Sequence, residues 1–284
     1  MPWHTSKRQI ALDRTLVMAI LNVTPDSFSD GGRFAGLDAA VKQAEKLVEE
    51  GADILDIGGE STRPGSARVP APEEIARVVP VISEISKRFD VPISIDTSKS
   101  EVAKAAVEAG AEIINDVSGL AWDPRMGEVA ARYNTGLILM HLIGEFDSMH
   151  IQPPVENIMQ EVSGGLRSSI RRAADAGVRE ESIALDIGIG FSKTMEQNLE
   201  LLAKLDKLCR EFSRFPMLAG TSRKSFIGKL LGGAPPGERL SGSLASAAAA
   251  VINGAKIVRV HDVRETVDAV RVADAIIKAG DKNR

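Results

Sequence analysis

Polar and charged side chains stand where a series of apolar, β-branched segments ends. They are Asn22, Asp56, Glu60, Asp96, Asn115, Asp116, His141, Asp186, the TSRKS segment 221–225, Arg259 and His261. One such residue at a strand end usually caps a helix or hydrogen-bonds a loop. Because nearly every segment of the series has one, we expect them to converge on a single site.

The residue types in this group suit the recognition of a flat, nitrogen-rich heterocycle. Such a ring has an edge of hydrogen-bond donors and acceptors that includes amidine-like N–H groups. This edge can pair with the carboxylates of Asp96 and Asp186 and with the amide of Asn115. Lys224 and Arg259 supply cations that suit a ring carbonyl, a ring nitrogen or the ring face.

A second part of the group suits a polyanion. Asn22, Arg259 and His261, with the hydroxyls and backbone N–H groups of Gly/Ser-rich loops, indicate phosphate binding assisted by a hard cation such as Mg2+ that takes few protein ligands. The four histidines show no metal-ligand spacing. The single cysteine, Cys209, excludes an internal disulfide and a multi-cysteine metal site.

The elements that must position these residues follow a βα pattern. Apolar segments alternate with segments of 3.6-residue periodicity, which predicts eight parallel strands and a (β/α)8 TIM barrel. The predicted strands are 16–22, 53–59, 92–97, 113–117, 136–141, 183–188, 216–221 and 256–261. We expect one domain over residues 1–284, with the barrel over about 15–280. A doubly wound open sheet is the alternative, but no Gly-x-Gly-x-x-Gly turn follows the first strand.

Composition excludes several classes of function. The chain has 35 Lys and Arg against 39 Asp and Glu, so it lacks the basic excess that binds a nucleic-acid backbone. No apolar run approaches the roughly 20 residues of a membrane span, and the N-terminus lacks a signal-peptide pattern. The expectation is a cytoplasmic protein with small-molecule substrates, and neither nucleic acid nor membrane as a partner.

Eight motifs, in order along the chain, carry a resemblance to a known family. LNVTPDSFSDGG, DIGGESTRPG, ISIDTSK, INDVSG, LMH, LDIGIGF, GTSRKSFIG and VRVHDV resemble the motifs of dihydropteroate synthases. The resemblance implies a transferase of folate biosynthesis that condenses 6-hydroxymethyl-7,8-dihydropterin diphosphate with 4-aminobenzoate. It also implies inhibition by sulfonamides, mobile loops at 26–32 and 61–65 that close over the substrates, and a homodimer through the last helices, one of which is predicted at 240–254.

The resemblance also assigns roles to individual residues. It implies pterin contacts for Asp96, Asn115, Asp186, Lys224 and Arg259, diphosphate contacts for Arg259 and His261, Mg2+ ligation by Asn22, and arylamine or other substrate contacts for Phe28, Thr62, Arg63, Pro64, Met140, Phe191 and Ser225. The implied mechanism is dissociative: cations stabilise the leaving diphosphate, and the arylamine attacks a cationic pterin methylene. Such a reaction needs no covalent nucleophile.

One stretch departs from the family pattern. In MHLIGEFDSMH, Ile143, Phe146 and Asp147 stand where the family commonly has Arg or Gln, Pro and Lys. The change is either neutral, at the rim of the pocket, or the mark of a variant with an altered rate. Two further alternatives are a non-catalytic pterin-binding paralogue and a corrinoid-dependent methyltransferase, which shares the barrel and the pterin pocket.

Overall fold

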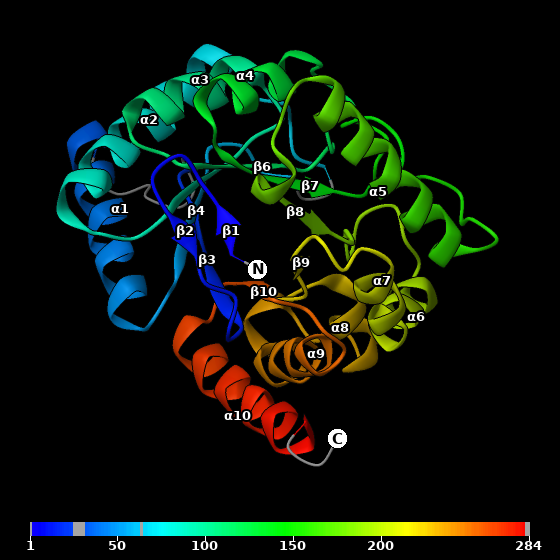
Figure 1. The fold of residues 1–284 in the computed structure, drawn as a ribbon. Helices are drawn as coiled ribbons and strands as arrows, with labels where there is room; N and C mark the ends of the chain where they lie inside the picture. The colour runs from blue at the N-terminus through cyan, green and yellow to red at the C-terminus, as the bar shows by residue number, and fades with distance from the viewer. Residues whose placement is uncertain (1, 25–31, 63–64, 282–284) are drawn as a thin grey trace.

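The eight predicted strands form a closed parallel barrel surrounded by helices (Figure 1). The computed structural model describes residues 2–24, 32–62 and 65–281. The strand order around the barrel is β10-β3-β4-β5-β6-β7-β8-β9. These strands are β3 (Leu16–Asn22), β4 (Ile54–Gly58), β5 (Ile93–Asp96), β6 (Ile113–Asp116), β7 (Gly136–Met140), β8 (Ile183–Asp186), β9 (Met217–Ala219) and β10 (Ile257–Val260). The prediction of a (β/α)8 barrel is confirmed.

Helices cover the outside of the barrel. They are α1 (Gly32–Glu49), α2 (Ala71–Arg88), α3 (Ser100–Ala109), α4 (Arg125–Tyr133), α5 (Ile158–Asp175), α6 (Met195–Ala203), α7 (Leu205–Glu211), α8 (Ser225–Leu230), α9 (Leu240–Ile252) and α10 (Val263–Asp281), with 3-10 turns η2 (Glu180–Ser182) and η3 (Pro236–Glu238). The helix predicted at 240–254 is α9. No helix in the described part of the chain is long and apolar enough to cross a membrane.

Three helices end at similar Gly-containing turns before the next strand. Gly51, Gly110 and Gly254 have φ values of 98°, 128° and 103°. Residues other than glycine rarely adopt this region, because a side chain would collide with the backbone. These turns return the chain to β4, β6 and β10, and so keep the strands in register.

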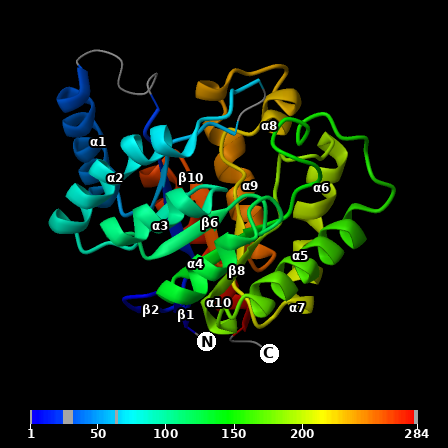
Figure 2. The ribbon, with the colours of Figure 1, turned by 90° about the horizontal axis from the view of Figure 1, so that it is seen from above.

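An N-terminal hairpin closes one end of the barrel. It consists of β1 (Trp3–His4) and β2 (Gln9–Ile10), and lies with both termini at the end opposite α8 (Figure 2). Trp3 is fully buried, and its indole N–H donates to the carbonyl of Ser182 at 2.8 Å. It packs with inward-facing residues of the barrel, including Met18 and Ile138. The hairpin and these side chains therefore fill the barrel at the end where the strands begin. The end where the strands finish is left for a ligand.

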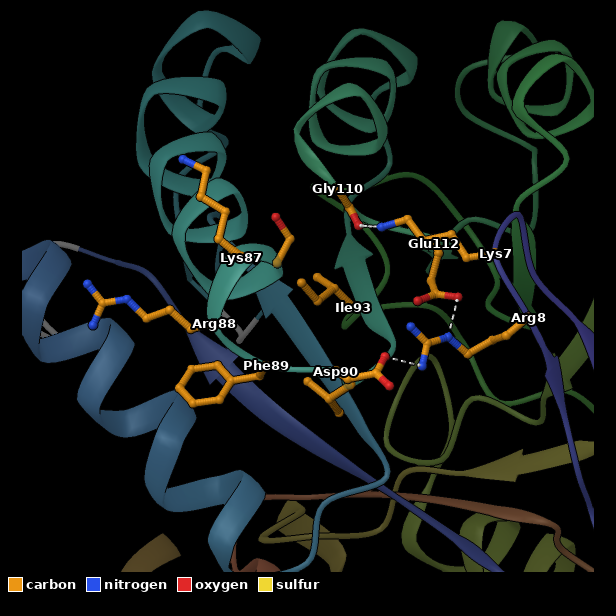
Figure 3. Close-up of a pocket in the computed structure, with 11 residues that line it drawn as sticks. Lys7, Arg8, Lys87, Arg88, Phe89, Asp90, Ile93, Gly110 and Glu112 are labelled. Atoms are coloured by element: carbon orange, nitrogen blue, oxygen red, sulfur yellow. Dashed lines mark hydrogen bonds and ion pairs between the residues drawn. The ribbon is translucent and has the colours of Figure 1, made fainter.

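Charged contacts fasten this hairpin to the barrel (Figure 3). Arg8 pairs with Glu112 at 3.1 Å and with Asp90 at 3.0 Å, and the ammonium of Lys7 donates to the carbonyl of Gly110 at 2.6 Å. A cavity of about 390 Å³ lies among these residues. Because Asp90 and Glu112 precede the strands β5 and β6, this cavity lies at the opposite end from the polar strand ends.

Candidate active site

Four neighbouring strands place three polar side chains and one glycine at one level of the barrel mouth. Asn22 on β3 is in register with Gly58 on β4, Gly58 with Asp96 on β5, and Asp96 with Asn115 on β6. A β-carbon built on Gly58 would lie 3.6 Å from Cβ of Asp96 and 3.9 Å from Oδ1 of Asn22. The absence of a side chain at Gly58 therefore leaves space between these two residues.

Arg259 on β10 is the centre of a charged cluster below this row. Its Nε lies 2.6 Å from Oδ2 of Asp56, and one terminal nitrogen lies 2.5 Å from Oδ2 of Asp96. The amide of Asn115 donates to the same Asp56 oxygen at 3.1 Å. Asp56 is fully buried, and its other oxygen, Oδ1, has no hydrogen-bond partner within the described residues. A ligand N–H or a water is needed to satisfy that oxygen.

Burial dominates the electrostatics of the cluster. It raises the pKa of Asp96 to about 7, with a smaller contribution from the Asp56 carboxylate, although Arg259 favours the charged form. Burial also raises the pKa of Asp186, against the N–H of Gly188 and the charge of Lys224. For Arg259, burial opposes the charge, yet Asp56 and Asp96 hold its pKa above the ordinary value.

Asp186 and Lys224 lie on the other side of the mouth, near Phe191. The Gly188 N–H donates to Oδ1 of Asp186 at 2.8 Å, which fixes the carboxylate at the end of β8. The Lys224 ammonium lies 4.0 Å from the centre of the Phe191 ring, in cation–π geometry. Burial, and then Arg259, lower the pKa of Lys224 to about 8. Gly190 lets the stem of Lys224 pass, since a β-carbon there would lie 2.8 Å from its Cδ.

Lys193 is a further residue of this region that sequence reasoning missed. Its ammonium donates to the carbonyls of His141, Gly188 and Phe191 at 3.3, 2.8 and 3.0 Å. Burial lowers its pKa to about 7. Lys193 thereby joins the ends of β7 and β8 and holds the loop that carries Phe191. The only sequence signal was a lysine two residues after Phe191 in GIGFSK.

The other predicted contact residues that the structure describes lie at or after the carboxyl ends of the barrel strands. Met140 and Phe191 belong to one apolar cluster with Val117, Phe146 and Met149. His261 Nδ1 lies 3.1 Å from the hydroxyl of Ser222, and Ser225 is exposed at the first position of α8. The backbone carbonyl of Thr62 contacts His150. Phe28, Arg63 and Pro64 lie outside the described residues.

Three strand-end residues do not face the cluster, contrary to the expected convergence. The His141 ring packs against Gly165 of α5, where a β-carbon would lie 2.4 Å from its Cδ2. Asp116 accepts hydrogen bonds from the N–H groups of Ser118 and Leu120 in its own loop. Glu60 pairs with Lys99 at 2.8 Å. Asp116 thus has the commoner role of a polar residue at a strand end, that of accepting hydrogen bonds within its own loop.

The atypical stretch after β7 is well packed. Phe146 is 5% exposed and meets Trp122 edge-to-face, with ring centres 6.0 Å apart. The hydroxyl of Ser192 accepts from the Ile143 N–H at 3.1 Å. Asp147 is exposed. At position 146, an aromatic ring therefore fills space at the rim.

Comparisons with known proteins agree with this arrangement. The model of the family described as "Pterin binding enzyme" matches residues 18–261. A dihydropteroate synthase of Clostridium beijerinckii is 47% identical over 267 residues, which cover 94% of this chain and 96% of the relative.

Solved structures are similar as well. A Yersinia pestis dihydropteroate synthase in a sulfonamide drug complex is 42% identical with a TM-score of 0.90, covering 98% of this chain and 100% of that one. A Xanthomonas albilineans dihydropteroate synthase with 4-aminobenzoic acid is 44% identical with a TM-score of 0.90, covering 97% of both chains. Sequence, fold and the polar barrel mouth agree: this chain belongs to the dihydropteroate synthase family of pterin-binding transferases.

Proposed function

We propose that the polar barrel mouth is the site at which this chain condenses 6-hydroxymethyl-7,8-dihydropterin diphosphate with 4-aminobenzoate, giving 7,8-dihydropteroate and diphosphate. The observation that carries this proposal is the buried cluster of Asp56, Asp96, Asn115 and Arg259, next to Gly58, which adds no side chain at the level of Asn22 and Asp96. Such a cluster at the carboxyl ends of barrel strands suits a polar, planar substrate.

The pterin is recognised by acceptors on both sides of the mouth. Asp96 and Asp186 accept from its amino and ring N–H groups, and Asn115 both donates and accepts. Lys224 donates to the ring carbonyl or a ring nitrogen, and the Arg259 guanidinium lies against the pterin. The buried carboxylates select this edge because an analogue without the matching donors leaves them unsatisfied.

The arylamine binds at the apolar rim beside the pterin. Phe191 and Met140 provide the surface for its ring, and Thr62 and Ser225 border it. Phe28, Arg63 and Pro64, outside the described residues, complete this part of the site by family resemblance. The Yersinia pestis and Xanthomonas albilineans proteins were solved with a sulfonamide drug and with 4-aminobenzoic acid, which supports the same ligands here.

The diphosphate end is formed by Asn22, Arg259 and His261. The amide oxygen of Asn22, at the carboxyl end of β3, is a hard donor of the kind that Mg2+ takes, and it fits a metal held mainly by phosphate oxygens and water. The described ranges contain no group of three or more His, Cys, Asp or Glu residues that could hold a metal. Asn22 is the proposed protein ligand. When bound, Mg2+ neutralises charge on the diphosphate.

The reaction breaks a C–O bond and forms a C–N bond. The bond between the pterin methylene and the diphosphate oxygen breaks, with its electrons leaving on the diphosphate, where Arg259 and His261 stabilise the charge. Asp96 and Asp186 stabilise the cationic pterin that remains. The arylamine nitrogen then donates its lone pair to the methylene carbon, and the proton that it loses passes to solvent water.

The proposed activity has a direct test. The purified chain is mixed with Mg2+, pterin diphosphate and labelled 4-aminobenzoate, and labelled dihydropteroate is expected. Binding of the pterin without product would indicate the non-catalytic alternative, and methyl transfer from methyltetrahydrofolate the corrinoid-dependent one. Neither alternative is supported by the relatives found.

A homodimer through α9 and α10 is also proposed. Ile252, Val272 and Ile276 on these helices are 53%, 61% and 58% exposed, and α9 and α10 pack against each other. Apolar side chains gathered on adjacent helices suit a symmetric interface. Light scattering at micromolar concentration is expected to give twice the monomer mass, and a monomer mass would contradict this proposal.

A further inference from the structure

His150, in the atypical stretch after β7, contacts the backbone of the loop after β4. Its Nε2 lies 2.8 Å from the carbonyl oxygen of Thr62. Because a carbonyl can only accept, Nε2 carries the hydrogen and donates it. The contact joins two βα loops that are 88 residues apart in the chain.

The same imidazole also contacts Phe191. The two rings are stacked, with centres 5.9 Å apart and planes inclined by 26°. Phe191 is 8% exposed and carries the Lys224 ammonium 4.0 Å from its ring centre. His150 thus links Thr62 to Phe191, two residues proposed to border the arylamine.

Independent contacts hold His150 in this place. The preceding residue, Met149, is 1% exposed, and its carbonyl accepts from the hydroxyl of Ser192 at 2.7 Å. That hydroxyl is also 2.7 Å from the carbonyl of Ile143. Ser192 directly follows Phe191, so the backbone next to His150 is tied to the backbone next to Phe191. The His150 imidazole therefore connects Thr62 to the backbone around Met149 and Ser192, which is itself held by hydrogen bonds.

We propose that His150 is a positioning residue for the arylamine substrate, holding the Thr62 backbone at a set distance from the Phe191 ring. The inference rests on the proposed arylamine site. A bridge that orders one border of the site before the substrate arrives lowers the entropy cost of binding. Its loss weakens binding of the arylamine and leaves the pterin cluster around Arg259 intact, since His150 has no contact there.

Two substitutions separate the parts of the bridge. His150→Phe keeps a ring for stacking on Phe191 and removes the donor to Thr62, whereas His150→Gln keeps a donor and removes the ring. Ile151→Ala is the matched control, because the neighbouring Ile151 is 79% exposed. Steady-state kinetics then give KM for each substrate and kcat.

We expect His150→Phe to raise KM for 4-aminobenzoate about three- to tenfold, the loss of one hydrogen bond, with KM for pterin diphosphate and kcat within about twofold of wild type. His150→Gln should show a smaller rise, and Ile151→Ala none. An unchanged KM for 4-aminobenzoate in His150→Phe would overturn the inference. An equal loss in all parameters together with a lower Tm would also overturn it, since that pattern marks a purely structural residue.

A binding measurement separates this inference from the proposed function. Calorimetric titration of 4-aminobenzoate in the presence of Mg2+ and diphosphate needs no turnover. If the wild-type chain makes no dihydropteroate, the proposed function fails, and the titration still decides the role of His150. Equal affinity for wild type and His150→Phe would contradict it, and an affinity about three- to tenfold weaker in the variant would support it.

Discussion

Arg259 and Asp56 form an ion pair inside the barrel, with Nε 2.6 Å from Oδ2, although 203 residues separate them in the chain. Asp56 is fully buried and also accepts from Asn115, so its carboxylate joins β4, β6 and β10 across the interior. A charge buried in this way requires its partners, because desolvation would otherwise disfavour it strongly. The pair therefore contributes both to the stability of the mouth and to its charge pattern.

Asp56→Asn tests this relationship. The substitution keeps the size of the side chain and removes its charge, which leaves Arg259 with Asp96 as its only described carboxylate partner. We expect the free energy of unfolding to fall by about 3 kcal/mol, measured by urea denaturation. Asp90→Asn, at the exposed partner of Arg8, is the control and should change little. Unchanged stability in Asp56→Asn would show that the ion pair contributes nothing net.

Asp186→Asn tests recognition of the pterin. Oδ1 of Asp186 accepts from the Gly188 N–H. If the asparagine oxygen keeps this hydrogen bond, its NH2 group faces the N–H donors of the pterin, so two donors oppose each other. We expect calorimetry to show binding of pterin diphosphate weakened by about 2 to 3 kcal/mol, with the Tm close to that of wild type. Wild-type affinity would remove Asp186 from the pterin site.

Asn22→Ala tests the proposed metal ligand. Loss of the amide oxygen should raise the Mg2+ concentration needed for half-maximal rate about tenfold, while binding of the metal-free pterin changes little. The measurement is the rate at a series of Mg2+ concentrations. Asn253→Ala, whose amide donates to the Leu202 carbonyl far from the mouth, is the control. An identical Mg2+ dependence in wild type and Asn22→Ala would exclude the role.

Lys193→Met tests the effect of the lowered lysine pKa on stability. The pKa of Lys193 is about 7 in the folded chain against 10.5 for an ordinary lysine, so between these values the unfolded chain binds the extra proton. The cost of burying the charged lysine therefore lowers the free energy of unfolding by its full amount below pH 7. This cost disappears as the pH rises from 7 to 10.5. The free energy of unfolding should rise less steeply with pH in Lys193→Met than in wild type. Parallel profiles would contradict the assignment.

The strand pattern of the barrel was predictable from local sequence. All eight strands were located, with ends that differ from the structure by at most two residues, because buried parallel strands are continuous apolar segments bounded by polar loops. Asp96, Asn115 and Asp186 end such segments, so their place at the mouth followed from the βα alternation. The N-terminal hairpin was not predicted, since its strands have two residues each and show no periodicity.

The assembly of the site depended on contacts between distant segments. Asp56 was recognised as a strand-end residue, but its ion pair with Arg259 was not, and Lys193 and His150 were given no role. His141 was expected at the site and instead packs against α5. Neither the tilt of a strand nor the direction of a loop side chain is encoded in a local pattern.

The sequence by itself therefore determined the fold class, the family and the set of strand ends from which a pterin site is built. Only the tertiary structure decided which side chains pair: Arg259 with Asp56, Lys193 with three backbone carbonyls, and His150 with Thr62. The physical reason is that periodicity and turn chemistry act over a few residues, whereas barrel closure sets the spacing between strands far apart in the chain.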